Sequence, residues 1–288
     1  MIFKIILLAN ILIFTISCNK TNNSVDSKYT DPIKYYKDYW PNESGNLDST
    51  EMAIHDFASA SECFDCHGQY FAEWTSSRHA HSFNDPIFKK GWHDAQIDFP
   101  DTGERFCIQC HAPIAFVTGE NDSYDVIKEG VTCTFCHSFT GFGETVNAND
   151  QIVANAIYKL NPGENTMYGP IENPDDNPYH NSEYSRLFSR SDMCLPCHDF
   201  TIGGIEAEIT FTEWRRIPGN DMGDLNSCQS CHMPLKTNGS HNHEFTGVDI
   251  NLTNAPGNSI YDQQYNSVLH LLQNAVILEF GGTTEEEI

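Results

Sequence analysis

The pattern of apolar and polar positions predicts three helices joined by long polar stretches. The first covers about residues 67–80, where aromatic side chains recur at helical spacing. The second begins after Asp85, a typical N-cap residue followed by proline, and runs through residue 92. The third covers residues 261–275, whose apolar side chains fall on one face of an amphipathic helix.

Strand signals are short and scattered. Residues 156–160 and 167–169 flank the turn-forming sequence Asn-Pro-Gly-Glu-Asn, which predicts a hairpin. Residues 172–178 are dense in Pro, Asp and Asn and are predicted to form a loop. Residues 276–280 predict a strand with no obvious partner. We therefore expect a fragment of a longer protein, a strand that pairs with another chain, or a frayed tail.

Ten of the eleven cysteines belong to five copies of the pentapeptide Cys-x-x-Cys-His, which is the attachment signature of haem c. Two cysteines three positions apart lie on one side of a helical turn, so both can form thioethers with one porphyrin while the histidine reaches the iron. The motifs predict five covalent haem c groups. The paired cysteines are Cys63 and Cys66, Cys107 and Cys110, Cys133 and Cys136, Cys194 and Cys197, and Cys228 and Cys231, followed by His67, His111, His137, His198 and His232.

Other uses of paired cysteines fit this pattern less well. Structural zinc usually takes two Cys-x-x-Cys pairs per ion, so five pairs would leave one over and the recurring histidine unexplained. A thioredoxin-like site needs one pair beside a βαβ pattern, and none is visible. Structural disulfides would not require a histidine after every pair.

Composition agrees with a polypeptide wrapped around cofactors. Hydrophobic residues make up 39% of the 288 residues, a little low for a chain of this size, and 19 Gly and 13 Pro favour loops. The haem macrocycles would supply the missing apolar volume. The predicted fold class is mainly α with extensive irregular loops wrapped around five haems, with short β segments and the start of a β domain at the C-terminus.

The N-terminus has the layout of a secretory signal. One positive charge, Lys4, precedes an apolar run over residues 5–14, which is shorter than the roughly 20 residues that span a membrane. Cys18 follows a small residue, as at bacterial lipoprotein processing sites, so we expect its lipidation; the alternative is ordinary cleavage with Cys18 lost or left free. Asn19 is not acidic, which favours the outer membrane. We expect an exported protein, periplasmic or on the cell surface.

Four regions follow from these signals. They are a signal peptide over 1–17, a tether and N-terminal extension over 18–50, a pentahaem domain over 51–247, and a C-terminal helix and strand over 248–288. The tether is predicted because its first residues are polar and unpatterned.

The net charge of −24 limits the classes of molecule that the protein can bind. Nucleic acid is excluded, because its binding depends on neutralising phosphates with Lys and Arg. An acidic surface steers basic partners, so we expect basic redox proteins. The unpaired terminal strand would also suit self-association or a larger complex.

Eight histidines lie outside the motifs and are candidates for the second axial position of the irons. Methionine is the competing ligand and raises the reduction potential, but the six methionines show no comparable grouping. We therefore expect mostly bis-histidine haems of low potential. The eight are His55, His79, His81, His93, His180, His241, His243 and His270.

Several segments resemble the multihaem cytochromes c related to tetrahaem cytochrome c-554 and to hydroxylamine oxidoreductase. Residues 74–80 have the pattern W-x-x-S-x-H-A and residues 85–88 the pattern D-P-x-F. The resemblance spans roughly residues 50–250, and proteins of this group often continue into a β-sandwich where this chain does not. Later segments similar to the group are 130–133, 194–199 and 228–234.

The resemblance implies distal ligation by His79, His180 and His243. For the other two haems, His55 and His93 rank above His81, His241 and His270. The resemblance also leaves two functions open. The first is electron transfer along a chain of saturated haems. The second is catalysis at one open iron that reduces or oxidises a small nitrogen or sulfur compound.

Overall fold

The computed structural model describes most of the haem-motif region. The predicted signal peptide over 1–17, Cys18, the tether over 18–50 and the strand over 276–280 all lie outside the described residues. Up to Thr246 the described chain belongs to one compact unit, and from Gly247 onward to a second. The described residues are 52–100, 103–142, 158–162, 165–202, 205–217, 226–247 and 259–275.

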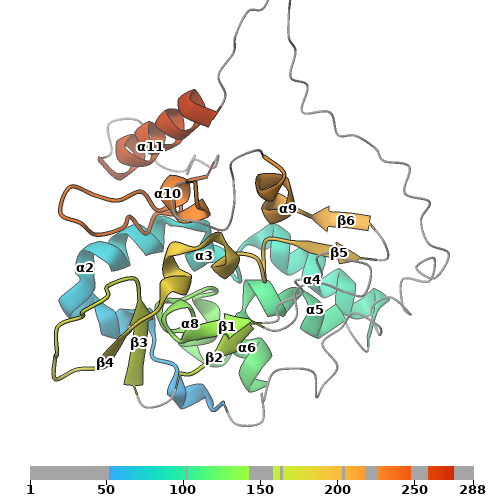
Figure 1. Ribbon diagram of the computed structural model, residues 1–288. Helices are drawn as coiled ribbons and strands as arrows, with labels where there is room; N and C mark the ends of the chain where they lie inside the picture. The colour runs from blue at the N-terminus through green and yellow to red at the C-terminus, as the bar shows by residue number, and fades with distance from the viewer. Residues whose placement is uncertain are drawn as a thin grey trace, which may run out of the picture. The chain divides into compact units, whose positions relative to one another are not determined.

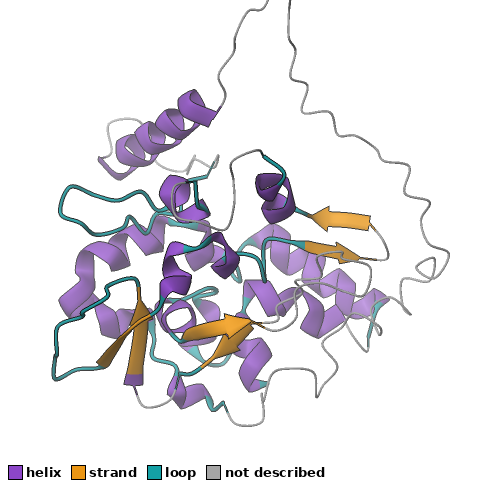
Figure 2. Ribbon diagram, viewed as in Figure 1, coloured by secondary structure: helices purple, strands orange, loops and turns teal. Residues whose placement is uncertain are grey.

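Short helices dominate the larger unit, with loops between them (Figures 1 and 2). The prediction of a mainly α fold with short strands and extensive loops is confirmed. No helix in the described ranges is long and apolar enough to cross a membrane. The α-helices are α2 (Ala60–Ser76), α3 (Arg78–His81), α4 (Pro86–Asp98), α5 (Gly103–His111), α6 (Pro113–Thr118), α7 (Asp125–Lys128), α8 (Cys133–His137), α9 (Thr210–Arg215) and α10 (Cys228–His232), and the 3₁₀ turns are η2 (Ile54–Asp56), η4 (Arg186–Ser189) and η5 (Ser191–Met193).

The first predicted helix differs from the observed one at both ends. Helix α2 begins at Ala60 because Ser59 caps it: the Ser59 hydroxyl accepts from the Ser61 amide at 3.2 Å, and Glu62 accepts from the Ser59 amide. It bends at His67 and ends at Ser76. Ser77 is extended and its hydroxyl caps the next helix, α3. The predicted single helix over 67–80 is therefore two helices.

The other two predicted helices are present. Asp85 caps α4 as predicted, its carboxylate accepting from the amides of Ile87 and Phe88 at 2.8 and 2.9 Å. Helix α4 continues to Asp98, six residues beyond the predicted end at residue 92. In the second unit, α11 (Ser259–Ala275) matches the predicted amphipathic helix over 261–275.

The predicted hairpin is wrong, although its strands exist. Strand β2 (Tyr158–Leu160) pairs antiparallel with β1 (Phe139–Phe142), while β3 (Thr166–Gly169) pairs in parallel with β4 (Asn181–Tyr184). The third two-stranded sheet joins β5 (Phe200–Ile202) to β6 (Ile205–Glu208). Burial decides the pairing of β2, because Tyr158 is fully buried beside Phe135 and Phe139.

The main core of the larger unit lies between α5, α6, α7, α8 and the β1–β2 ladder. All but the last residue of α6 are buried. Tyr158 reaches into the same cluster and donates its hydroxyl to the Gln109 carbonyl at 2.9 Å, so its polar end is satisfied. The buried members of the cluster are Phe57, Phe83, Ile108, Ala112, Ile114, Ala115, Phe116, Val117, Val126, Ile127, Phe135, Phe139 and Tyr158.

Candidate haem-binding site

All five motifs lie on helical turns of the larger unit, and we number the sites 1 to 5 by motif order. Site 1 lies in α2, site 2 at the end of α5, site 3 in α8 and site 5 in α10. Site 4 is a turn in which the amides of Cys197 and His198 both bond to the Cys194 carbonyl. The ten motif cysteines are free of disulfides, as thioether formation requires.

Three motif histidines each lie opposite a histidine from a distant part of the chain. The ring centres of His67 and His180 are 6.3 Å apart. Those of His79 and His198 are 6.2 Å apart, and those of His137 and His243 are 6.5 Å apart. His79, His180 and His243 are the three histidines that the family resemblance implied as distal ligands. The fold thus brings each of them to a different motif.

These separations fit an iron between each pair of rings. Two metal–imidazole bonds of about 2.0 Å, together with about 1.2 Å from each ring nitrogen to its ring centre, place the two ring centres roughly 6.4 Å apart. Ring centres in ordinary aromatic contacts also lie about 4.5–7 Å apart. What distinguishes these pairs is that each joins a motif histidine to a histidine from a distant part of the chain. The residues present therefore fit three bis-histidine haems at sites 1, 3 and 4.

Backbone carbonyls orient several of these imidazoles. The Nδ1 atom of His137 bonds to the Tyr168 carbonyl at 2.7 Å, and that of His232 bonds to the Thr246 carbonyl at 2.6 Å. His180 and His243 make similar bonds to Asn181 and His241, both at 3.0 Å. Such a bond fixes the ring and leaves Nε2 as the nitrogen available to a metal.

Burial keeps two of the distal imidazoles neutral. Desolvation, with the nearby rings of His198 and His232, lowers the pKa of His79 to about 3. Desolvation, with the nearby ring of His137, lowers the pKa of His243 to about 4. Neutral imidazole is the form that ligates a metal, so at neutral pH both rings are ready to bind.

The His79 ring is held by packing rather than by a hydrogen bond. Its Nδ1 atom is buried and has no hydrogen-bond partner among the described residues. The Phe245 ring meets it edge-on with the ring centres 4.3 Å apart. On the backbone side, the His79 carbonyl accepts from the amides of Val131 and Ser82 at 3.1 and 3.3 Å. The bond from Val131 holds α3 against the loop that leads into site 3, while the bond from Ser82 closes the end of α3 itself.

Thiols of different sites lie close enough to shift one another's pKa. The neighbouring Cys133 lowers the pKa of Cys63, and Cys63 raises that of Cys133, which places sites 1 and 3 next to each other. Cys197 interacts directly with Cys110 of site 2, and Cys194 with Cys228 of site 5. Cys136 is close enough to Cys197 for burial and that thiol together to raise the pKa of Cys136 to about 12. Site 4 therefore neighbours sites 2, 3 and 5.

The predicted ligands His55 and His93 lie in a different setting. Their side chains are 82% and 70% exposed, and each ring lies near the carboxylate of the aspartate that follows it, Asp56 or Asp94. Neither ring contacts a motif histidine in the part of the chain that the structure describes. Ligation by His55 and His93 stays a prediction.

The three lower-ranked histidines lie in different surroundings. The His241 ring is oriented by a 2.7 Å bond from Nδ1 to the Met233 carbonyl, the arrangement seen at the paired histidines. His81 is exposed at the end of α3. His270 lies in α11, in the second unit.

Site 2 is built differently from sites 1, 3 and 4. The His111 ring stacks on Phe88 with ring centres 4.1 Å apart and planes at 11°, and its Nδ1 atom bonds to the Ser82 carbonyl at 3.0 Å. Among the described residues, the ring contact of His111 is with a phenyl group from α4.

Sequence reasoning missed a buried polar cluster beside site 3. Glu73, in α2, forms an ion pair with Lys236 at 2.7 Å, and both adjoin His243. The two residues are 163 positions apart and neither belongs to a motif, so only the tertiary fold reveals their contact.

Comparisons with known proteins agree with this geometry. Residues 62–138, which contain the first three motifs, match the family described as cytochrome c554 and c-prime. A penta-heme cytochrome c552 from Thermochromatium tepidum has a similar structure, with a TM-score of 0.55 and 25% sequence identity. That match covers 68% of this chain and 58% of the other, so it spans less than two thirds of that protein. No curated protein matches the chain.

The helical haem motifs, the opposed histidine pairs and these similarities together identify the chain as a multihaem c-type cytochrome. Its prosthetic groups are covalently attached haem c. When bound, each haem supplies an iron that takes up and releases one electron. The motif cysteines would hold these groups, the motif and opposed histidines would ligate the irons, and the apolar surroundings would tune the potential.

Proposed function

We propose that the protein is an exported pentahaem cytochrome that carries electrons along a chain of mostly bis-histidine haems. The observation that supports this best is the set of three imidazole pairs separated by 6.2–6.5 Å. An iron ligated on both sides has no free position for a substrate, so it can exchange electrons but not bind a reactant. Respiratory or extracellular electron transfer is the setting that suits such a carrier.

The contacts between cysteines support a continuous path through the protein. Site 1 adjoins site 3, site 3 adjoins site 4, and site 4 adjoins both site 2 and site 5. Neighbouring thioether positions bring porphyrin edges close together, which is the condition for rapid transfer of single electrons. We infer a branched path in which site 4 is the junction.

The net charge and the N-terminal sequence support the proposed partners, export and lipid anchor. A net charge of −24 favours basic redox partners through long-range attraction. The apolar segment before Cys18 supports export and a lipid anchor, and the non-acidic Asn19 favours the outer membrane. Labelling cells with a palmitate analogue tests the anchor, because a Cys18→Ser variant should lose the label.

Electron paramagnetic resonance (EPR) of the oxidised, purified protein tests the carrier function. We expect low-spin signals from the haems of sites 1, 3 and 4, and a step-wise reduction by one electron per haem in a potentiometric titration. High-spin iron at these three sites would contradict the proposal.

One observation favours catalysis as a second candidate function, at site 2. His111 stacks on Phe88, whereas the motif histidines of sites 1, 3 and 4 each face a second imidazole. An iron held there by His111 alone would have an open position for a small nitrogen or sulfur compound. A high-spin signal that changes on addition of nitrite, hydroxylamine or sulfite, and that is lost when Cys107 and Cys110 are replaced by serine, would support this alternative.

A further inference from the structure

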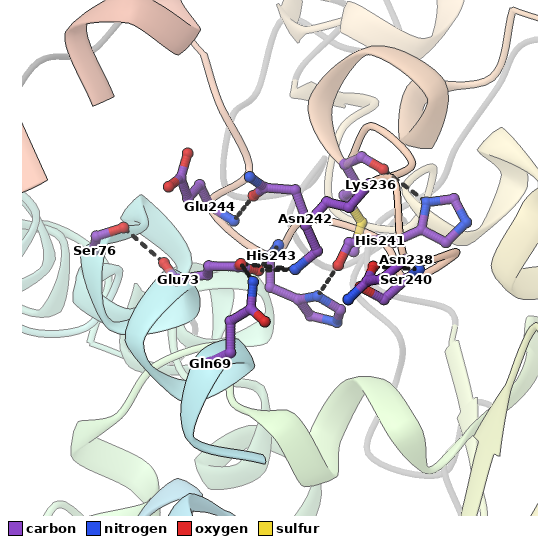
Figure 3. Close-up of polar contacts among 11 residues, drawn as sticks. Gln69, Glu73, Ser76, Lys236, Asn238, Ser240, His241, Asn242, His243 and Glu244 are labelled. Atoms are coloured by element: carbon purple, nitrogen blue, oxygen red, sulfur yellow. Dashed lines mark hydrogen bonds and ion pairs between the residues drawn. The ribbon is translucent and has the colours of Figure 1, made fainter. Parts of the chain in front are cut away.

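A buried carboxylate lies at the centre of a polar cluster between α2 and the loop that carries His243 (Figure 3). The Glu73 side chain is only 7% exposed, yet it makes four hydrogen bonds. It accepts two from the Lys236 ammonium at 2.7 and 3.0 Å, one from the Gln69 amide at 2.9 Å, and one from the backbone amide of His243 at 2.9 Å. These bonds, which outweigh the effect of burial, lower the pKa of Glu73 below its usual value.

The loop that carries His243 has little regular structure of its own. Its internal backbone bonds include those from the Lys236 amide to the Ser240 carbonyl at 2.7 Å, from the Gly239 amide to the Lys236 carbonyl at 2.9 Å and from the Asn242 amide to the Pro234 carbonyl at 3.0 Å. They fix the shape of the loop but do not connect it to α2. The position of His243 relative to α2 therefore depends on contacts outside the loop. Glu73 holds the loop at two points, the Lys236 side chain and the His243 backbone (Figure 3).

We propose that Glu73 is the positioning residue for the distal ligand of site 3, holding His243 at its distance from His137. The inference rests on the proposed bis-histidine ligation of that site. The 2.9 Å bond acts on the backbone of His243 itself, so a displaced carboxylate would move the imidazole directly. The hydrogen bonds of Glu73 go to Gln69, Lys236 and the His243 backbone and to neither imidazole of the pair, so Glu73 acts through His243.

The ionised carboxylate is the group that this position requires. One of its oxygens accepts from Gln69 and Lys236, and the other accepts from Lys236 and His243. A glutamine at position 73 would offer one acceptor oxygen and turn an NH₂ group toward one of these donors. It would also leave the Lys236 ammonium, which is 21% exposed, without its counter-charge.

The same cluster joins site 3 to site 1. Tyr70 lies one helical turn before Glu73, and its ring centre is 4.9 Å from that of His243 and 5.9 Å from that of His67. The Lys236 ammonium lies 4.9 Å above the Tyr70 ring. Helix α2 thus carries the haem motif of site 1 and also fixes the distal ligand of site 3, which sets the geometry between these two haems.

The test is the EPR spectrum and reduction potential of site 3 in the full holoprotein. A His243→Ala variant first identifies the low-spin signal that belongs to this site. Glu73→Gln should then shift or abolish that signal and move the potential of that haem, while the signal assigned to site 4 stays unchanged. Glu62→Gln is the matched control on the same helix, because glutamine retains the capping role of the exposed Glu62.

A second variant separates positioning from general loss of packing. In the Glu73→Gln/Lys236→Gln double variant, two amides can bond to each other and the oxygen of residue 73 can still accept from His243, so the signal should recover. An unchanged signal in Glu73→Gln would overturn the proposal. Equal changes in the signals of all haems would also overturn it. So would a double variant whose site 3 signal differs from that of the unmodified protein as much as the signal of Glu73→Gln does.

Failure of the proposed function gives a different result. If His243→Ala itself leaves every low-spin signal in place, the ligand assignment of site 3 is wrong. If His243→Ala removes a signal and Glu73→Gln does not affect it, only the positioning role is wrong.

Discussion

The rings of His79 and His198 lie 6.2 Å apart with their planes at 70° to each other. The planes of His137 and His243 are nearly parallel, at 17°, and those of His67 and His180 lie at 34°. The three pairs share a separation but differ in relative orientation. Orientation matters because the π system of each axial imidazole interacts with the two iron orbitals dxz and dyz, which extend out of the porphyrin plane.

We predict that the haem of site 4 gives a low-spin EPR signal with a much larger maximum g value than that of site 3. Crossed imidazole planes leave the two iron orbitals nearly equal in energy, whereas parallel planes separate them. A His79→Ala variant should remove the large-g signal and produce one high-spin haem. Loss of the signal assigned to site 3 instead would show that His79 serves another iron.

Replacement of Gly130 by alanine should be strongly destabilising and should disturb site 4. Gly130 has a φ of +69°, and a Cβ there would lie 2.3 Å from the Ser82 hydroxyl and 2.7 Å from the His79 carbonyl. The backbone of α3, which carries His79, would have to move. We expect a loss of about 3–5 kcal/mol in the free energy of unfolding, measured by denaturant titration, with a high-spin signal from site 4.

Gly119 provides the matched control for this substitution. It has nearly the same backbone angle, +71°, but a Cβ there would meet nothing within 4 Å. Gly119→Ala should therefore cost only the strain of the left-handed conformation, about 1–2 kcal/mol, and leave all haem signals unchanged. Equal losses at the two positions would show that the close approach of Gly130 to α3 is unimportant.

Trp74→Phe should destabilise the protein through one hydrogen bond. The Trp74 indole is 7% exposed and donates to the Val131 carbonyl at 2.8 Å, which ties α2 to the segment before α8. Phenylalanine retains a six-membered aromatic ring but lacks the five-membered ring and its N–H. The carbonyl then loses its donor and some packing is lost, for an expected loss of about 1–3 kcal/mol in the free energy of unfolding.

The control for Trp74 is Trp214→Phe. The Trp214 indole makes a similar 2.7 Å bond to the Asn226 carbonyl at an exposed position, where water can replace it. Trp214→Phe should therefore lower the free energy of unfolding distinctly less than Trp74→Phe in the same thermal or denaturant measurement. A loss at position 214 that matches the loss at position 74 would argue against burial as the reason.

Removal of the haem at site 4 should interrupt transfer between the remaining haems. Replacing Cys194 and Cys197 by serine should lower the haem content by one, measured as the pyridine haemochrome, and should slow the equilibration of electrons after partial reduction. Replacing Cys228 and Cys231 should lower the haem content equally but leave equilibration among sites 1 to 4 fast. Similar kinetics in the two variants would contradict a junction at site 4.

Some features of the fold could be predicted from local sequence because local chemistry determines them. Asp85 followed by proline forms an N-cap in almost any context, and the prediction there is confirmed. The hairpin prediction failed because β2 pairs with β1 and β3 pairs with β4, not with each other. Burial of Tyr158 against Phe135 and Phe139 selected β1 as the partner of β2, and no local pattern contains that information.

The same distinction between local sequence and tertiary contacts applies to the candidate site. The sequence alone determined where porphyrin can attach, since both thiols and the adjacent histidine lie within one helical turn. Only the tertiary structure decided that His79 faces His198, that His243 faces His137, and that Glu73 meets Lys236 across 163 positions. Contacts between distant segments depend on how the chain packs as a whole, so spacing along the sequence fixes the attachment of each haem but not its second ligand or its neighbours.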